Sequence, residues 1–235
     1  MGDDLAARGW VVLDGLATRD EVDAAREALR PLLDEAPWGA NSFVGRRTKR
    51  VFGLPAKTRA LDGMLTHPTV LELVERTLGP HLLSTTVAVE IHPGETAQTP
   101  HTDGSAWPVP AGAGEVVVNA IWALDDFTAA NGATLIDGDP VLMPAGSVLV
   151  YVGTLEHGGG ANTTDAPRLA LVTGYTAAWL RQQENFTLTC PPDLAATMPP
   201  DLAGLLGYRL YPPFVGHVDG RDPSELLRAA KRSSR

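Results

Sequence analysis

Residues 82–91 of this chain read LLSTTVAVEI, a run rich in β-branched residues that partly alternates between apolar and polar side chains. Three comparable runs follow: VVVNAIWAL at 116–124, VLVYV at 148–152 and LALVTGY at 169–175. Glycine, proline and aspartate residues separate the runs, as they do in turns between short strands. Several short strands joined by such turns predict a β-sandwich or barrel over about residues 81–180.

The segment before this β-rich region has the pattern of helices. Thr18 and Glu21 form a capping-box pattern, and the apolar residues that follow at helical spacing predict a helix ending at about Glu35. A second helix is expected at 70–78, because a proline precedes it and a Gly-Pro pair follows it.

The tail at 181–235 is rich in proline and is expected to be irregular. Within it we expect a short helix near 202–206 and a mobile basic end, LLRAAKRSSR. We therefore expect a single domain over 1–235, mostly β with peripheral helices (α+β). Its helical N-terminal part should cover about 1–80, before the β-rich core.

Composition limits the classes of partner. The chain has 235 residues, and 19 lysine and arginine residues against 28 aspartate and glutamate residues give a net charge of −9. This balance argues against nucleic-acid binding, which needs a basic face. A single cysteine, Cys190, excludes an intrachain disulfide. The N-terminus lacks the apolar segment of a signal peptide, and no apolar run is long enough to span a bilayer. We expect a cytoplasmic protein without a membrane partner, whereas the sequence does not indicate its oligomeric state.

The strongest local signal for chemistry is the motif His101-Thr102-Asp103. On an extended segment, residues two apart point to the same side of the strand. An imidazole and a carboxylate in that arrangement suit a divalent metal such as Fe(II), Mn(II) or Zn(II). Taken alone, the motif is more often a surface histidine beside an acid.

Two later residues have properties that complement this motif. His157 follows a β-run and precedes three glycines, which permit close backbone approach. Arg168, eleven residues further on, opens an otherwise apolar strand. Because buried arginine is rare without an anionic partner, its guanidinium indicates a site for a carboxylate.

This combination of an HxD motif, a distant histidine and an arginine eleven residues later resembles the Fe(II)/2-oxoglutarate-dependent dioxygenases. It is most similar to the phytanoyl-CoA dioxygenase-like family, over about residues 9–179. Other stretches that agree with that family are GE at 94–95, NAIWALDD at 119–126, NGAT at 131–134 and PAGS at 144–147. The resemblance implies a double-stranded β-helix core, the jelly-roll or cupin-like fold.

The resemblance also implies a cofactor set. His101, Asp103 and His157 would be the three ligands of Fe(II), leaving three coordination positions open. In the family, 2-oxoglutarate occupies two of these positions and O2 takes the third. Related halogenases replace the carboxylate ligand with a small residue, so the presence of Asp103 favours hydroxylation or a related oxidation.

Four more residues are predicted around this centre. By the resemblance, Arg168 would bind the distal carboxylate of 2-oxoglutarate, with the hydroxyl of Thr134 supporting it. Gln98 matches a polar residue near the metal end. Trp107 is expected either to line the substrate pocket or to cover the rim of the barrel as a loop aromatic.

Two features do not follow directly from the family resemblance. The segment between the NGAT turn and His157 is shorter than is usual in the family. This shorter connection predicts either a more open site or a site that the tail or another subunit closes. A basic cluster, Arg46-Arg47 with Lys49-Arg50, could attract an anionic substrate, but we expect a solvated loop.

Three functions are compatible with these patterns. The first is an Fe(II)/2-oxoglutarate oxygenase that oxidises, by hydroxylation, a small organic molecule and converts 2-oxoglutarate to succinate. The second is a metal-dependent cupin-type isomerase or lyase without a cosubstrate, which would not need Arg168. The third is a non-catalytic binding module on a β-sandwich, which would need none of the three metal-ligand candidates.

Overall fold

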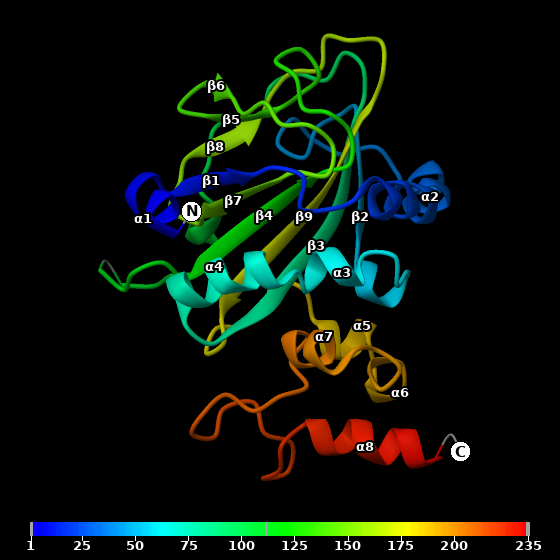
Figure 1. The fold of residues 1–235 in the computed structure, drawn as a ribbon, viewed down its shortest axis with the longest axis vertical. Helices are drawn as coiled ribbons and strands as arrows, with labels where there is room; N and C mark the ends of the chain where they lie inside the picture. The colour runs from blue at the N-terminus through cyan, green and yellow to red at the C-terminus, as the bar shows by residue number, and fades with distance from the viewer. Residues whose placement is uncertain (1, 111, 234–235) are drawn as a thin grey trace.

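The strands of the protein form two sheets in the computed structural model, which describes residues 2–110 and 112–233 (Figure 1). Within these residues, the larger sheet has six strands in the order β1-β7-β4-β9-β3-β2, and the smaller has three in the order β6-β5-β8. All neighbouring pairs are antiparallel. The strands are β1 (Trp10–Leu13), β2 (Thr48–Phe52), β3 (His81–Ile91), β4 (Val117–Ala123), β5 (Thr134–Ile136), β6 (Asp139–Pro140), β7 (Val148–Val152), β8 (His157–Gly159) and β9 (Arg168–Ala177).

The α-helices lie on the side of the larger sheet, and all of those in the described residues come before β3 or after β9 in the chain. The α-helices are α1 (Gly2–Arg8), α2 (Arg19–Glu35), α3 (Asp62–Leu65), α4 (Pro68–Leu78), α5 (Phe186–Thr189), α6 (Pro192–Ala195), α7 (Pro200–Leu205) and α8 (Ser224–Ser233). Short 3₁₀ turns lie at Leu54–Ala56 and Asp103–Ala106. The helices predicted at 18–35 and 70–78 correspond to α2 and α4.

The two sheets pack against each other in the manner of a jelly roll, so the predicted fold class is confirmed. Alternation along β4 shows how the layers form. Ile121 and Ala123 face the smaller sheet, where they join a buried cluster with Ile136 of β5. Ala120 and Trp122 point to the opposite face and join the main core. This opposite orientation of successive side chains is the two-residue period of a strand.

Helices cover the outer face of the larger sheet. In Figure 1, α3 and α4 cross this face, and α4 contacts β3, β4 and β9. The capping box predicted for α2 is present, because the Thr18 hydroxyl accepts a bond from the Glu21 amide while the Glu21 carboxylate accepts one from the Thr18 amide. In the apolar stripe of α2, Leu29 and Leu33 are completely buried, and Leu32 is partly buried.

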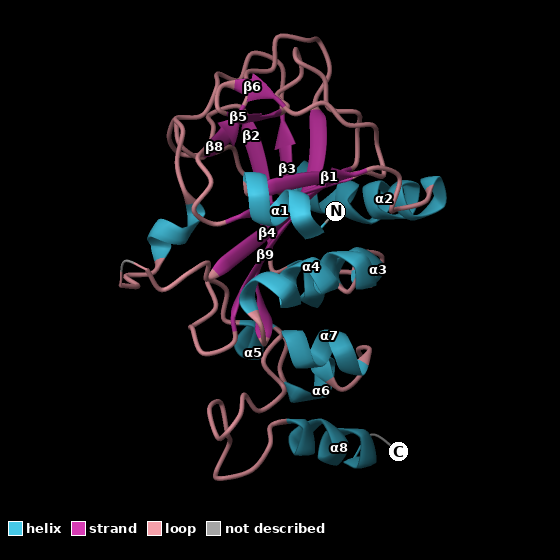
Figure 2. Cartoon of the chain, turned by 60° about the vertical axis from the view of Figure 1, so that its left-hand side comes forward, coloured by secondary structure: helices cyan, strands magenta, loops and turns pink. Residues whose placement is uncertain are grey.

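The C-terminal extension is more regular than expected, since α5 to α8 lie within it (Figure 2). The short helix expected near 202–206 is α7. The basic end, expected to be mobile, contributes most of α8 as far as Ser233, whereas residues 234–235 lie outside the described part. Two local features explain why this end is helical. The Asp222 carboxylate accepts a hydrogen bond from the Ser224 amide at 2.8 Å at the start of the helix, and Leu227 packs against the main core.

No helix in residues 2–110 and 112–233 has the length and apolar character needed to cross a membrane. The expected cytoplasmic location stays a prediction.

Replacing Leu29 with alanine should lower the free energy of unfolding by about 2–5 kcal/mol, because it leaves a cavity under α2. The matched control is Leu188→Ala on α5, where the side chain is 76% exposed and the expected change is within about 0.5 kcal/mol. Urea unfolding followed by circular dichroism measures both. Equal losses for the two variants would contradict the proposed position of the core.

Candidate metal centre and its cavity

The backbones of His101 and His157 lie side by side as an antiparallel pair at the edge of the smaller sheet. The His101 amide donates to the His157 carbonyl at 2.9 Å, and the His157 amide donates to the His101 carbonyl at 3.0 Å. This pairing places the two imidazole rings 4.5 Å apart, centroid to centroid. Residues separated by more than fifty positions thus present their side chains together.

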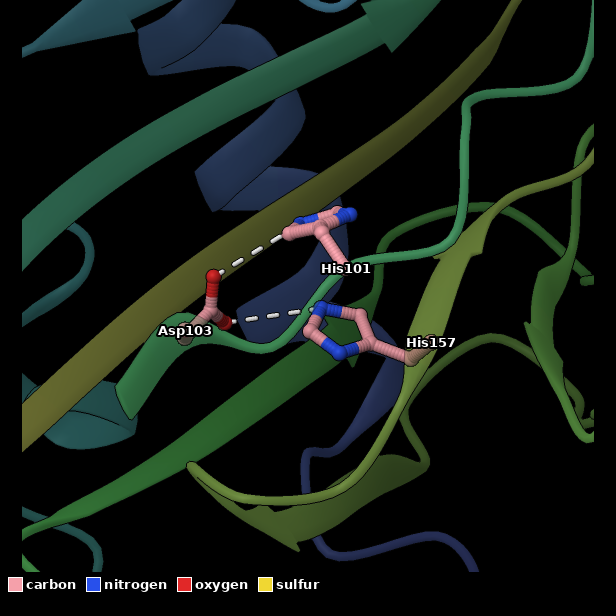
Figure 3. Close-up of side chains that lie close together, drawn as sticks. All are labelled: His101, Asp103 and His157. Atoms are coloured by element: carbon pink, nitrogen blue, oxygen red, sulfur yellow. Dashed lines mark ion pairs between the residues drawn. The ribbon is translucent and has the colours of Figure 1, made fainter. Parts of the chain in front are cut away.

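Asp103 completes the group. Its Oδ1 lies 3.6 Å from Nε2 of His101 and its Oδ2 lies 3.4 Å from Nε2 of His157 (Figure 3). One ligand atom from each of the three residues falls within 4.8 Å of the others, a spacing that fits a single metal ion. The structure therefore brings together the three side chains that the sequence singled out.

Both histidines are oriented for metal binding by their other ring nitrogen. Nδ1 of His101 donates to the Thr99 carbonyl and Nδ1 of His157 donates to the Leu155 carbonyl, each at 3.1 Å. In the neutral imidazole this leaves the lone pair on Nε2, the nitrogen that faces Asp103. Burial lowers the pKa of His157, which favours the neutral form that binds metals. The donor set fits Fe(II).

Two residues that the sequence did not indicate hold Asp103 in place. The Asn119 amide donates to Oδ2 of Asp103 at 2.8 Å, and the Tyr151 hydroxyl lies 3.2 Å from the same oxygen. The Tyr151 hydroxyl is also 3.0 Å from Nε2 of His157. Both residues are buried and face inward from otherwise apolar strands. A polar residue on the inner face of an apolar strand was the available signal.

These groups lie in a cavity of about 330 Å³ between the sheets. Every residue predicted for the site lines it: His101, Asp103, His157, Arg168, Thr134, Gln98 and Trp107. Much of the remaining wall is apolar and is made of inward-facing residues of the larger sheet, among them Val87, Val89, Ile121 and Val172.

Arg168 carries a buried charge without an acidic partner. It is 3% exposed, its guanidinium lies over the Phe127 ring at 4.0 Å from the centroid, and one amino group donates to the Gly132 carbonyl. Its Nε has no hydrogen-bond partner, and no ion pair to it occurs among the described residues. Burial, and then the charge of Arg50, lowers the pKa of Arg168 to about 9. Such a cation is suited to an anionic ligand.

Comparison with known proteins agrees with this geometry. Residues 5–136 match the family model described as phytanoyl-CoA dioxygenase (PhyH). The chain belongs to this family. It is 33% identical to the dioxygenase af480 of Aspergillus fumigatus, over 86% of this chain and 74% of that protein. It is 28% identical to the dioxygenase FrzG of a Cladobotryum species, over 89% of this chain and 84% of that protein.

The fold is shared with solved enzymes. The non-heme alpha ketoglutarate dependent epimerase SnoN from nogalamycin biosynthesis superposes with a TM-score of 0.66 at 24% identity, over 77% of this chain and 84% of that one. Membership in the phytanoyl-CoA dioxygenase family confirms the predicted enzyme class, a dioxygenase-type enzyme. The group His101, Asp103 and His157 could hold a metal ion, in agreement with the predicted iron cofactor.

The family resemblance placed Thr134 and Gln98 near the cosubstrate, but the two residues differ in whether their polar groups face the cavity or bind other parts of the chain. Thr134 is buried on β5 and faces the cavity. Gln98 uses both ends of its amide, because its oxygen accepts from the Gly159 amide at 3.1 Å and its nitrogen donates to the Phe43 carbonyl at 2.9 Å. Its visible role is to fasten the segment before the HxD motif to β8.

The glycines after His157 allow the strands of the smaller sheet to come this close. A Cβ atom at Gly160 would lie 2.7 Å from the carbonyl oxygen of Ala133, a distance that side chains do not adopt. The close approach expected from the sequence is therefore present.

The tail contributes to the mouth of the cavity. The Trp107 indole donates to the Arg181 carbonyl at 2.9 Å, so the loop after the HxD motif is fastened to the segment that follows β9. Gln183 of the same segment lines the cavity. Of the alternatives for the shortened connection, these contacts support closure by the tail.

Replacing Asn119 with leucine should weaken metal binding about 10- to 100-fold, because Asp103 loses the donor that orients it. Anaerobic titration with Co(II), followed by visible absorption, measures this. Tyr151→Phe should act in the same direction.

The control is Tyr208→Phe, which removes a phenol hydroxyl bonded to the Cys190 carbonyl and outside the cavity. Co(II) binding should be unchanged in this variant. Wild-type affinity in both Asn119→Leu and Tyr151→Phe would contradict the orienting role.

Proposed function

We propose that this chain is a non-haem Fe(II)- and 2-oxoglutarate-dependent oxygenase that hydroxylates a small organic substrate while 2-oxoglutarate is converted to succinate and CO2. One observation carries the proposal: three metal-ligand candidates converge in the same cavity as the unpaired guanidinium of Arg168. A divalent metal and a dicarboxylate would satisfy both features together.

The residues have distinct roles in this proposal. His101, Asp103 and His157 hold the iron on one side, which leaves the other positions for exchangeable ligands. Bound iron supplies the redox chemistry by which O2 oxidises 2-oxoglutarate and a C–H bond of the substrate. Asn119 and Tyr151 keep the Asp103 carboxylate in its ligating orientation.

Arg168 and Thr134 would bind and orient the cosubstrate. Arg168 has no acidic partner in the protein, so a carboxylate that enters beside it would supply one and accept hydrogen bonds from the guanidinium. The Thr134 hydroxyl faces the same cavity and can donate to that carboxylate. The apolar walls exclude water from the reacting groups.

Two features bear on the substrate and the outcome. A cavity of about 330 Å³ is at the small end of the range for ligand sites, which supports a small organic molecule. Asp103 occupies the carboxylate position, which supports hydroxylation over halogenation. SnoN is named as an epimerase, so the shared fold accommodates other outcomes. An isomerase or lyase without a cosubstrate leaves the buried charge of Arg168 unused.

Anaerobic addition of Fe(II) and 2-oxoglutarate should produce a weak visible charge-transfer band, and oxygen should then yield succinate. Both signals should be absent in His101→Ala, because this variant loses a metal ligand. His217→Ala, which changes an exposed histidine, is the control and should behave as the wild type. A wild-type protein that gives neither band nor succinate would refute the proposed function.

Replacing Arg168 with leucine should weaken 2-oxoglutarate binding at least about 100-fold, since a desolvated charge pair is lost. Calorimetric titration of the Co(II)-loaded protein measures this affinity. Co(II) affinity should change little, because Arg168 makes no contact with the three ligand residues. Unchanged 2-oxoglutarate affinity in this variant would favour the cupin-type alternative.

A further inference from the structure

Two guanidinium groups mark one end of the cavity. Arg50 of β2 lines the wall together with Arg168. Arg50 lies opposite Val89 of β3, and Arg168 lies opposite Ile91 of the same strand, so strand register places the two cations close together. The positive charge of Arg50 accordingly lowers the pKa of Arg168. Both cations therefore belong to the end of the cavity at which we place the cosubstrate.

The basic cluster at 46–50 thus divides between solvent and cavity. Arg46 and Arg47 are exposed, as expected of a solvated loop, and Lys49 donates to backbone carbonyls at the end of α2. The expectation of a solvated loop is wrong for Arg50, because pairing of β2 with β3 turns alternate residues of the cluster inward.

The opposite end of the cavity has no cation. Along β3 the inward side chains continue as far as Thr85, which lies opposite Gly174 of β9. Gly174 is six residues beyond Arg168 on β9, and a rise of about 3.3 Å per residue separates their Cα atoms by about 20 Å. Gly174 also lies opposite Asn119, which donates to Asp103, so this end adjoins the proposed metal centre. A substrate that is oxidised at the metal would lie here.

Two backbone features give this end its space and its polarity. The register of β3 against β9 shifts between Leu83 and Thr85, and this bulge allows the successive residues Ser84 and Thr85 both to line the cavity. A Cβ atom at Gly174 would lie 3.0 Å from Oδ1 of Asn119 and 3.0 Å from Cγ2 of Thr85. The missing side chain of Gly174 therefore leaves room beside the metal centre.

The tail closes this end with a short segment, residues 181–184, which we call the tail strap. The Glu184 amide donates to the Ser84 carbonyl at 2.8 Å. The Glu184 carboxylate accepts from the Gly53 amide at 2.7 Å and from the Thr85 hydroxyl at 3.0 Å. These bonds fasten the tail strap to the bulge of β3 and to the turn after β2.

Gln183 of the tail strap has a fixed backbone and a free side chain. Its backbone amide donates to the Ser84 hydroxyl at 3.0 Å. Its side chain lines the cavity, and within the described part of the chain the side-chain amide has no hydrogen-bond partner. By contrast, the Gln182 side chain donates to the Leu83 and Leu205 carbonyls. Gln183 therefore offers a neutral group that can both donate and accept hydrogen bonds toward the cavity.

We propose that the Gln183 amide binds a neutral oxygen group, a hydroxyl or a carbonyl, of the substrate that is oxidised, whose apolar body packs against Trp107 and Val117. This inference rests on the proposed function and adds a substrate class, uncharged apolar molecules with an alcohol or ketone group. A substrate carboxylate at this end would be desolvated without a cation, and the Glu184 carboxylate would repel it.

The test uses the anaerobic full chain loaded with Fe(II) and 2-oxoglutarate at about pH 8, where an exposed glutamate is ionised. One probe set is acetophenone, 1-phenylethanol and ethylbenzene, and a longer set is 4-phenylbutan-2-one, 4-phenylbutan-2-ol and butylbenzene. Binding is followed by the shift of the charge-transfer band and by calorimetry. The quantity compared is the Kd of the hydrocarbon divided by the Kd of the ketone or alcohol of the same set, because this ratio isolates the oxygen group.

In at least one set this ratio should fall about three- to tenfold in Gln183→Leu, since a neutral hydrogen bond is lost. Gln183→Glu distinguishes the two oxygen groups. Its ionised carboxylate only accepts hydrogen bonds, so the variant should keep the ratio for the alcohol and lose it for the ketone. A purely structural role of Gln183 would change both ratios alike.

Arg181→Leu is the matched control, because it changes an exposed side chain of the same tail strap that lies outside the cavity. It should keep the wild-type ratios. Gln183→Leu should also keep the wild-type affinity for 2-oxoglutarate within about threefold, which shows that the variant is folded and that Gln183 is separate from the cosubstrate end.

Three results would overturn the inference while leaving the proposed function intact. The first is the same ratio in the wild type and Gln183→Leu for both sets, or no binding of any probe. The second is a loss of 2-oxoglutarate affinity in Gln183→Leu, which would assign Gln183 to the cosubstrate. The third is binding of benzoate or 3-phenylpropanoate to the wild type about tenfold more tightly than the ketone of matching length. Absence of the band in the wild type would instead defeat the proposed function itself.

Discussion

Two hydrogen bonds join the backbones of His101 and His157, and they set the distance between two side chains that are far apart in the chain. Everything else at the centre is arranged around this pair. Gln98 fastens the preceding segment to β8, and the missing side chain at Gly160 lets β8 approach β5. Once the imidazoles are adjacent, Asp103 needs only the local turn after His101 to reach both of them.

Charge in a low-dielectric cavity is the second constraint. Arg168 and Arg50 face the same cavity, and neither has an acid within ion-pair distance among the described residues. Folding removes these guanidinium groups from bulk water. Hydrogen bonds to backbone carbonyls stabilise their positive charge, and for Arg168 the Phe127 ring does so as well. The cavity is thus suited to anions, in keeping with the dicarboxylate cosubstrate that we propose for this member of the phytanoyl-CoA dioxygenase family.

Local patterns predicted the regular elements well where one physical signal dominated. The capping box at Thr18 indicated α2, and Pro68 indicated the start of α4. Runs of β-branched residues indicated β3, β4, β7 and β9. The C-terminal helix was missed because its basic composition outweighed the helix start at Asp222. The inward position of Arg50 was missed because a run of basic residues does not reveal which of them a strand turns inside.

The sequence by itself determined the kinds of ligand atoms, through an HxD motif, a histidine before glycines and an arginine opening a strand. These candidates can be recognised from the sequence because the chemistry of a side chain and the two-residue period of a strand depend only on neighbouring residues. Only the tertiary structure decided which groups support them. Asn119, Tyr151 and Arg50 reach the cavity because strand order and register place three separate strands around it. Pairing between distant segments depends on packing of the whole sheet, so no short stretch of sequence carries that information.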